Sequence, residues 1–269
     1  MMPETITFAD LESLRKAVQW LEHPSLAARL TSMVGRPIDL MGRALPKGAS
    51  RAIATAAAKS LQAGLKIALN TIRNEPQESS LLLHKALAVA SGAAGGAFGL
   101  ASLPVEVPIS TIIMLRSILD IARSEGENLA DPESALSCIE VFGLGGRTET
   151  DDAAETGYFI VRGMLAASVT EAARYIAERG VVEEGAPALV RLIAQISARF
   201  GVVVTQKAAA QAIPVIGALG GAAVNYAFVE HFQTVARGHF TVRRLERSYG
   251  EDLVRTTYER LSKESKPTK

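Results

Sequence analysis

The sequence predicts an all-α protein: a single compact bundle of about ten helices with glycine- and alanine-rich hairpins at its centre. Apolar residues recur with the 3.6-residue period of an amphipathic helix along most of the 269-residue chain. No convincing stretch shows the period of two that marks a strand. The composition is aliphatic, with 48% hydrophobic and only 5% aromatic residues, which is typical of helical packing.

Prolines and glycines divide the N-terminal part into helices. An apolar stripe that begins at Leu11 predicts a first helix that ends before Pro24. Short helical pieces follow, and the alanine-rich stretch from Ser50 to Arg73 predicts one long helix. The next helix, which enters a glycine-rich run, can be capped by Ser79 or Ser80.

Three helices are expected in the middle of the chain. The first spans Val105 to Ser124. Asp131 followed by Pro132 is a strong start signal for the second, because aspartate caps a helix and proline suits its first position. This helix ends at the glycines of residues 143–146, and the third, after an acidic loop at 148–152, ends at Gly180.

Two further helices are expected before Pro214, one of them closing at Gly201, and the valines at 202–204 give only a weak hint of a strand. A long helix follows from about Val215 to Tyr249, and then a polar final helix. No segment has the composition of a linker, so we expect one structural domain overall. Its parts are an N-terminal helical segment (1–78), a helical core (79–250) and a C-terminal helix with a basic tail (251–269).

Two uncharged runs stand out. The stretch from Ala86 to Leu115 carries one charge in thirty residues, at Glu106, and a second run covers Ala208 to Val229. Glycines spaced by four remove side chains from one helix face, so that a facing backbone can approach closely. Two interpretations fit these runs: a tightly packed hairpin inside a soluble core, or a hairpin inserted in membrane. The glycine pairs are Gly92 with Gly96, Gly95 with Gly99, and Gly217 with Gly221.

Charge and cysteine content limit the class of protein. Lysine plus arginine (29) nearly balances aspartate plus glutamate (28), so no nucleic-acid partner is expected. The single cysteine, Cys138, excludes an internal disulfide framework and suits a reducing compartment. The polar start MMPETITFAD does not have the pattern of a secretory signal, and we expect a cytoplasmic protein.

Catalytic and cofactor motifs are missing from the sequence. It contains no GxxxxGK[ST] phosphate loop, no GxSxG elbow and no HExxH pair. His231 and His239 are eight residues apart, about 12 Å along an intact helix, too far to share a metal ion. We therefore expect no cofactor and no metal site, while the sequence leaves open whether the protein is an enzyme.

Glu106 is the residue that most requires a partner. A carboxylate in an apolar run must form an ion pair, accept hydrogen bonds or take up a proton. One interpretation is a structural ion pair with Arg162, Lys207 or an arginine of the C-terminal helix. The other is a polar site for a small ligand or substrate between the central hairpins. The candidate residues for that site are Glu106, Arg116, Arg162, Lys207, Asn225, His231 and Arg243.

Several blocks of the sequence resemble a known family. They are LPVEVPISTIIMLRSILDIARSEGE (103–127), IEVFGLGG (139–146), YFIVR (158–162), SARFGVVVTQKAAAQAIPVIGALGGAAVN (197–225) and HFQTVARGHFTVRRLERSYG (231–250). Together they resemble the bacterial EcsC family over about residues 80–250, so the segment 79–250 is EcsC-like.

The resemblance implies a cellular context but no molecular activity. The family is named for a protein encoded beside an ABC transporter, no molecular activity is established for it, and it supplies no catalytic residues. We therefore expect a non-enzymatic protein at the cytoplasmic face of the inner membrane, linked to transport or secretion. Its expected partner is membrane lipid or a membrane protein such as an ABC transporter.

Overall fold

The computed structural model describes residues 5–22, 26–35, 47–73, 103–146, 157–179, 185–212 and 217–265, together with positions 38, 42 and 45. Every regular element within these residues is an α-helix, which confirms the predicted all-α class. Nine helices are described, against about ten expected. They are α1 (Phe8–Glu22), α2 (Leu26–Val34), α4 (Lys47–Arg73), α6 (Leu103–Ser124), α7 (Pro132–Leu144), α9 (Tyr158–Arg179), α10 (Pro187–Gln211), α11 (Gly217–Tyr249) and α12 (Glu251–Ser265).

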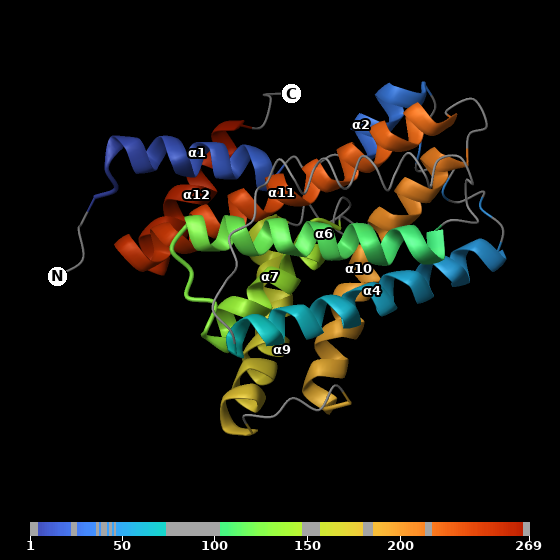
Figure 1. Ribbon diagram of the computed structural model, residues 1–269. Coiled ribbons are helices and arrows are strands. Elements are labelled where there is room, and N and C mark those ends of the chain that lie inside the picture. Colours follow the sequence, from blue (N-terminus) through green and yellow to red (C-terminus); the bar gives the residue numbers. More distant parts are fainter. Residues whose placement is uncertain are drawn as a thin grey trace.

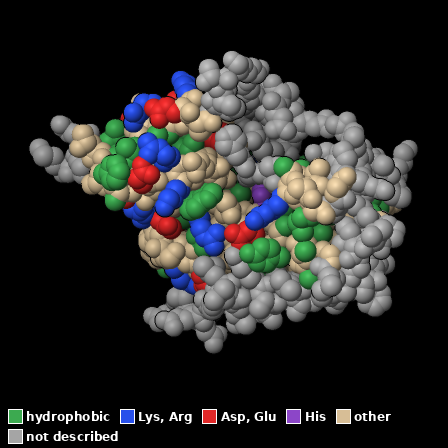
Figure 2. Space-filling view, turned by 90° about the horizontal axis from the view of Figure 1, so that it is seen from above, with side chains coloured by type: hydrophobic (Ala, Val, Ile, Leu, Met, Phe, Trp, Pro, Cys, Tyr) green, Lys and Arg blue, Asp and Glu red, His purple; other side chains and the backbone are tan. Residues whose placement is uncertain are grey.

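The bundle is built around α7. Every residue from Ser134 to Leu144 is buried, because α4, α6, α9, α10 and α11 all contact this helix. The helices α4 and α6 lie side by side along one side of the bundle, while α1 and α12 pack on α11 (Figure 1). At the end that carries α1 and α12, basic and acidic side chains are interspersed on the surface (Figure 2).

Four phenylalanines join the central helices. Phe142 of α7, Phe200 of α10, and Phe228 and Phe232 of α11 pack ring against ring, with centroids 5.1 to 6.1 Å apart. All four are 0% exposed. Several of these contacts are edge-on, the geometry that aromatic pairs prefer, and each is worth about 0.5 to 1.5 kcal/mol beyond the buried area. This cluster fixes α10 and α11 against α7.

Local sequence signals produce several helix ends as predicted. The Asp131 carboxylate accepts a hydrogen bond of 3.0 Å from the Ser134 N–H, with a proline at the start of α7. Gly126 and Gly250 follow α6 and α11 with φ values of 79° and 88°, a backbone conformation that glycine adopts far more readily than other residues.

The prediction of two helices before Pro214 is wrong. A single helix, α10, runs from Pro187 to Gln211 and passes through Gly201 without ending. Of the three valines that follow, Val203 and Val204 are buried in the core as part of this helix. Packing of that apolar face outweighs the cost of about 1 kcal/mol that a glycine imposes in a helix interior.

Close backbone contact occurs at the glycines that follow α7. A Cβ atom at Gly146 would lie 2.2 Å from the carbonyl oxygen of Arg199 in α10. At Gly145 it would lie 2.6 Å from the ring of Phe232. These positions have no room for a side chain, so they bring α7, α10 and α11 together as well as ending a helix.

Several expectations fall outside the described residues: the Ser79 or Ser80 cap, the acidic loop at 148–152, and the glycine pairs within 92–99. Of the third pair, Gly217 begins α11 and Gly221 is buried. Close packing at these pairs therefore stays a prediction. The described parts of both uncharged runs contribute to the core, for example through Val107 and Phe228.

One helix in the described part of the chain, α10, is long and apolar enough to cross a membrane, judged by length and composition only. Of its most apolar stretch, 44% is buried in the bundle. It contacts α2, α4, α7, α9 and α11. A core helix passes the same test, and these contacts are those of a core helix.

Candidate functional site

Glu106 forms a buried ion pair with Lys207. The Lys207 Nζ lies 2.8 Å from the Glu106 Oε1, and their side chains are 0% and 3% exposed. Lys207 also donates to the Oδ1 of Asn225 at 2.7 Å, and the Gln211 amide donates to both carboxylate oxygens of Glu106 at 3.0 and 3.1 Å. These four residues, from α6, α10 and α11, are here called the Glu106–Lys207 cluster.

The ammonium group of Lys207 depends on this cluster for its charge. Complete burial lowers its pKa, and the charge and hydrogen bond of Glu106 offset part of that effect. The Nζ also lies 4.6 Å from the ring centroid of Phe228, within range of a cation–π contact. Glu106 sits in the first turn of α6, where a carboxylate meets the favourable end of the helix dipole.

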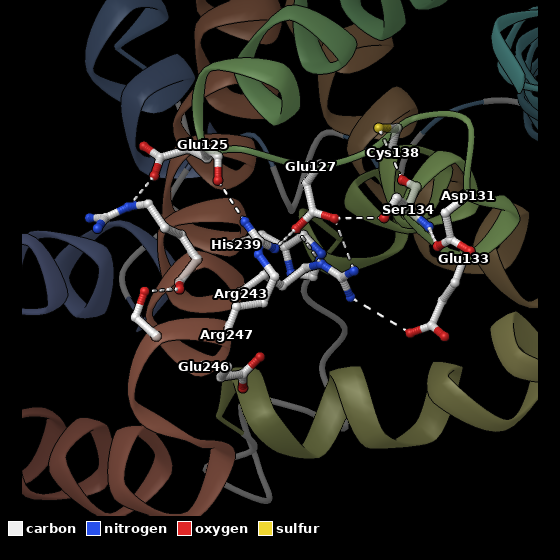
Figure 3. A network of polar contacts seen from close by, with 12 residues as sticks. Glu125, Glu127, Asp131, Glu133, Ser134, Cys138, His239, Arg243, Glu246 and Arg247 are labelled. Atoms are coloured by element: carbon white, nitrogen blue, oxygen red, sulfur yellow. Dashed lines mark hydrogen bonds and ion pairs between the residues drawn. The ribbon is translucent and has the colours of Figure 1, made fainter. Parts of the chain in front are cut away.

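A second polar network lies where the α6–α7 loop meets the C-terminal part of α11 (Figure 3). The carboxylate of Glu127, 2% exposed, accepts hydrogen bonds from Arg243 at 2.9 and 3.1 Å and from Ser134 at 2.8 Å. Arg247, one turn after Arg243, donates to the same group. Burial alone would raise the pKa of Glu127, but these partners, Arg243 above all, hold it below its usual value.

The network continues towards α1. Arg244 bridges Glu125 at 2.8 Å and Asp10 at 3.0 Å, and the Tyr249 hydroxyl donates to the Asp10 carboxylate at 2.7 Å. The hydrogen bonds from Tyr249 and Arg244 lower the pKa of Asp10. These contacts connect α1 to the end of α11.

A third group lies between α7, α9 and α11. Arg162 binds Glu246 through two hydrogen bonds of 2.7 and 2.9 Å. The hydroxyl of Tyr158 lies 2.8 Å from the Nδ1 of His239, and the Nε2 of that histidine lies 4.0 Å from the Oε2 of Glu140. Tyr158, His239 and Glu140 are all buried.

Comparison with protein-family models matches the EcsC protein family over residues 4–245, from before α1 to near the end of α11. The chain belongs to the EcsC protein family. The match includes residues 4–79, a part of the chain that the resembling sequence blocks did not cover. No curated protein matches the chain, and no solved structure matches it either.

The seven candidate residues of this EcsC chain do not lie in one cluster. Three of them, Glu106, Lys207 and Asn225, belong to the Glu106–Lys207 cluster. Arg162 is bound to Glu246 and Arg243 to Glu127, in the neighbourhood of α11. The two others lie elsewhere: His231 bonds to the carbonyl of Gly145 at 2.8 Å, and Arg116 is exposed on α6.

Ion-pair formation by Glu106 is confirmed, and the structure selects Lys207 from the partners considered. Gln211, a further partner of this carboxylate, was missed because no pattern marks a glutamine at the end of an alanine-rich run. Glu140 could have been found, since it is the only charge in the eleven residues from Ser134 to Leu144. The reasoning applied to Glu106 applies equally to that residue.

The EcsC chain has no arrangement for metal chemistry within its described residues: no three His, Cys, Asp or Glu side chains are placed to share an ion. Its buried charges are mostly bound to one another, as in Arg162–Glu246 and Arg243–Glu127. Such pairs join neighbouring parts of the bundle. Ligand binding at the candidate residues stays a prediction.

Proposed function

We propose that this EcsC protein binds the anionic surface of the cytoplasmic membrane as a peripheral, non-enzymatic protein, and that α4 is the contact helix. The observation that carries the proposal is the charge of α4. This helix of 27 residues contains five basic residues and no acidic one, in a chain whose net charge is +1. The basic residues are Lys47, Arg51, Lys59, Lys66 and Arg73.

The helix has a buried apolar face and an exposed basic one. Ile53, Leu61 and Leu65 pack into the core, whereas Arg51, Lys59 and Lys66 are exposed. Lys59 and Lys66 are seven residues apart, two turns of the helix, so they lie along one line of its surface. A row of cations on one helix face is suited to a flat layer of anionic headgroups.

The helices α2 and α10 contain no acidic residue. α10 contacts both α4 and α2. α2 carries one basic residue and α10 carries three, but of these three Lys207 is buried in the ion pair with Glu106 and Arg191 is paired with Glu171. By contrast, α12 contains four acidic and three basic residues. The excess of basic residues therefore lies on α4, away from the mixed surface at the end that carries α1 and α12 (Figure 2).

Apolar side chains are exposed on α6, next to α4. Val105 is 66% and Ile109 45% exposed, and they are spaced by four residues on one face of α6. Exposed apolar side chains near basic ones are the combination with which peripheral helices enter the headgroup region.

The expected free energy of membrane binding favours reversible association. Each basic side chain near an anionic leaflet contributes about 1 kcal/mol, so the three exposed cations contribute about 3 kcal/mol. Burying the exposed parts of Val105 and Ile109 adds roughly 2 kcal/mol. A total of about 5 kcal/mol gives binding that vesicles can detect and that salt can reverse.

The test is co-sedimentation of the full chain with vesicles of phosphatidylcholine alone or mixed with phosphatidylserine. We expect binding to the mixed vesicles only, and release at about 0.5 M salt. The triple variant Arg51→Gln, Lys59→Gln, Lys66→Gln should bind more weakly, on the order of 100-fold.

The matched control is Arg255→Gln, Arg260→Gln, Lys263→Gln on α12, which changes the net charge equally and should bind as the wild type does. Equal loss of vesicle binding in both triple variants would mean that net charge alone determines binding, and it would contradict a role for α4. Absence of binding to lipid vesicles, with binding to native membranes that proteolysis abolishes, would also contradict it. That result would favour a membrane-protein partner such as a transporter.

A further inference from the structure

Three titratable side chains from three helices meet in the interior, away from α4. Glu140 of α7, His239 of α11 and Tyr158 of α9 are 3%, 0% and 5% exposed. The His239 ring lies between the other two, with Nδ1 2.8 Å from the Tyr158 hydroxyl and Nε2 4.0 Å from the Glu140 carboxylate. We call these residues the Glu140 triad.

Two atoms of the triad have no hydrogen-bond partner within the described residues: Oε1 of Glu140 and Nε2 of His239. A buried carboxylate without partners is expensive in its ionised form. The nearest cations, Arg162 and Arg243, relieve it only in part, because they are already bound to Glu246 and Glu127 by two hydrogen bonds each.

Charge balance in this region depends on Glu140. With a neutral carboxyl at this position, the two largely buried guanidinium groups (Arg162 and Arg243) are matched by two buried carboxylates (Glu246 and Glu127), while Arg247 and Glu133 at the edge of the group are about half exposed. Ionisation of Glu140 leaves one buried negative charge in excess. A proton on this carboxyl therefore favours the packing of α7, α9 and α11.

The histidine can adapt to either state of Glu140. A protonated carboxyl can donate to Nε2 once the 4.0 Å gap shortens, and Nδ1–H of His239 then donates to the Tyr158 oxygen. When Glu140 is ionised, the other tautomer fits: Nε2–H points to the carboxylate and the Tyr158 hydroxyl donates to Nδ1.

We propose that Glu140, His239 and Tyr158 form a buried site that binds one exchangeable proton, and that the tautomer of His239 follows that proton. The site is independent of lipid binding at α4.

The pKa values agree with this geometry. Burial raises the pKa of Glu140 to about 7, although the charges of Arg162 and Arg243 oppose the shift. Burial lowers the pKa of His239 well below its ordinary value, so the carboxyl and not the imidazole takes up the proton. The site would thus change state in the physiological range, as a pH-responsive element within the fold.

The charged groups around Glu140 come from three helices. They are Arg162 of α9, Arg243 and Glu246 of α11, and Glu133 of its own helix. Other helices meet α7 at other residues: Gly64 of α4 faces Ile139, Arg199 of α10 binds the carbonyl of Gly143, and Arg123 of α6 acts on Cys138.

The test is a pH titration by NMR of protein labelled with ¹³C at glutamate carboxyl carbons, with Glu140 assigned through its own backbone. We expect the Glu140 signal to titrate with a midpoint near 7, far above the value of about 4.3 of an exposed glutamate. The ¹⁵N shifts of the His239 ring should report a change of tautomer over the same pH range.

The variant Glu140→Gln imitates the neutral carboxyl and should lose both transitions while it remains folded. The control Glu133→Gln removes an exposed carboxyl of the same helix and should keep both. A Glu140 midpoint below pH 5 would overturn the proposal, and so would a His239 ring that keeps one tautomer throughout. These signals are read in the wild type, so the test does not depend on either variant.

Discussion

Glu106 and Lys207, which are 101 positions apart in the chain, form an ion pair of 2.8 Å from which solvent is excluded. The carboxylate comes from the first turn of α6 and the ammonium group from the last turns of α10. Lys207 also donates a hydrogen bond to Asn225, and Glu106 accepts one from Gln211. A buried pair of this kind costs more when one partner is removed than when both are replaced.

The pair should therefore respond asymmetrically to mutation. We expect Glu106→Ala to lower the free energy of unfolding by about 3 to 5 kcal/mol, because it leaves the Lys207 ammonium group buried and uncompensated. Glu106→Gln should cost less, since it keeps the shape and some hydrogen bonds. The double variant Glu106→Gln, Lys207→Met should be more stable than Lys207→Met alone. Denaturant unfolding of the wild type and the four variants measures this, and strictly additive losses would contradict it.

The glycines that follow α7 should not tolerate a side chain. Gly146→Ala would place a methyl group 2.2 Å from the backbone oxygen of Arg199, so we expect a loss of several kcal/mol or failure to fold. Gly163→Ala in α9 is the control, because nothing lies within 4 Å of its added Cβ and alanine favours the helix. The control should gain about 0.5 to 1 kcal/mol. Equal melting temperatures for both variants would contradict the close contact.

His231 should make the protein sensitive to acid. Burial lowers its pKa to about 4, from an ordinary value of 6.5, although its hydrogen bond to Gly145 opposes the shift. The unfolded chain therefore binds a proton more readily than the folded one between pH 6.5 and 4. The contribution of neutral His231 to the free energy of unfolding is therefore fully present above pH 6.5. It is lost as the pH falls towards 4, by up to about 3 kcal/mol.

The comparison for this pH effect is His231→Gln, which can still donate to the Gly145 carbonyl but does not titrate. Denaturant unfolding at a series of pH values should give a shallower loss for the variant than for the wild type. Parallel curves for the two proteins between pH 6.5 and 4 would assign the acid sensitivity to other groups.

Cys138 should be inert in the native protein. It is 0% exposed, and burial raises the pKa of its thiol, so almost no thiolate is available as a nucleophile. We expect a chromogenic disulfide reagent to label one thiol per chain in denaturant and none on the same timescale in native buffer. Rapid labelling of the native protein would mean that α7 is more open than described.

Much of the fold could be predicted because its signals are local. Asp131 and the glycines at 126 and 250 specify helix ends through their own hydrogen bonds and backbone conformations. The prediction that a helix ends at Gly201 was wrong, because whether a glycine ends a helix depends on the packing of its neighbours. That packing is a property of the whole bundle.

The candidate site was harder to predict. The need of Glu106 for a partner follows from its apolar neighbours, but the choice of Lys207 depends on how α10 lies against α6. The position of Arg162 beside Glu246 likewise depends on the docking of α9 against α11. The charge of α4 is visible in the sequence, whereas the exposure of Lys59 and Lys66 follows only from the packing of the opposite face.

The most direct measurement of the proposed function is the distance of α4 from the bilayer. A fluorophore attached at Gln62→Cys on the exposed face of α4, in a Cys138→Ser background, is compared with one at Thr256→Cys on α12. Vesicles of phosphatidylcholine and phosphatidylserine carry a headgroup quencher. Membrane binding through α4 predicts strong quenching at position 62 and little at position 256. Equal quenching at both positions, or stronger quenching at 256, would contradict it.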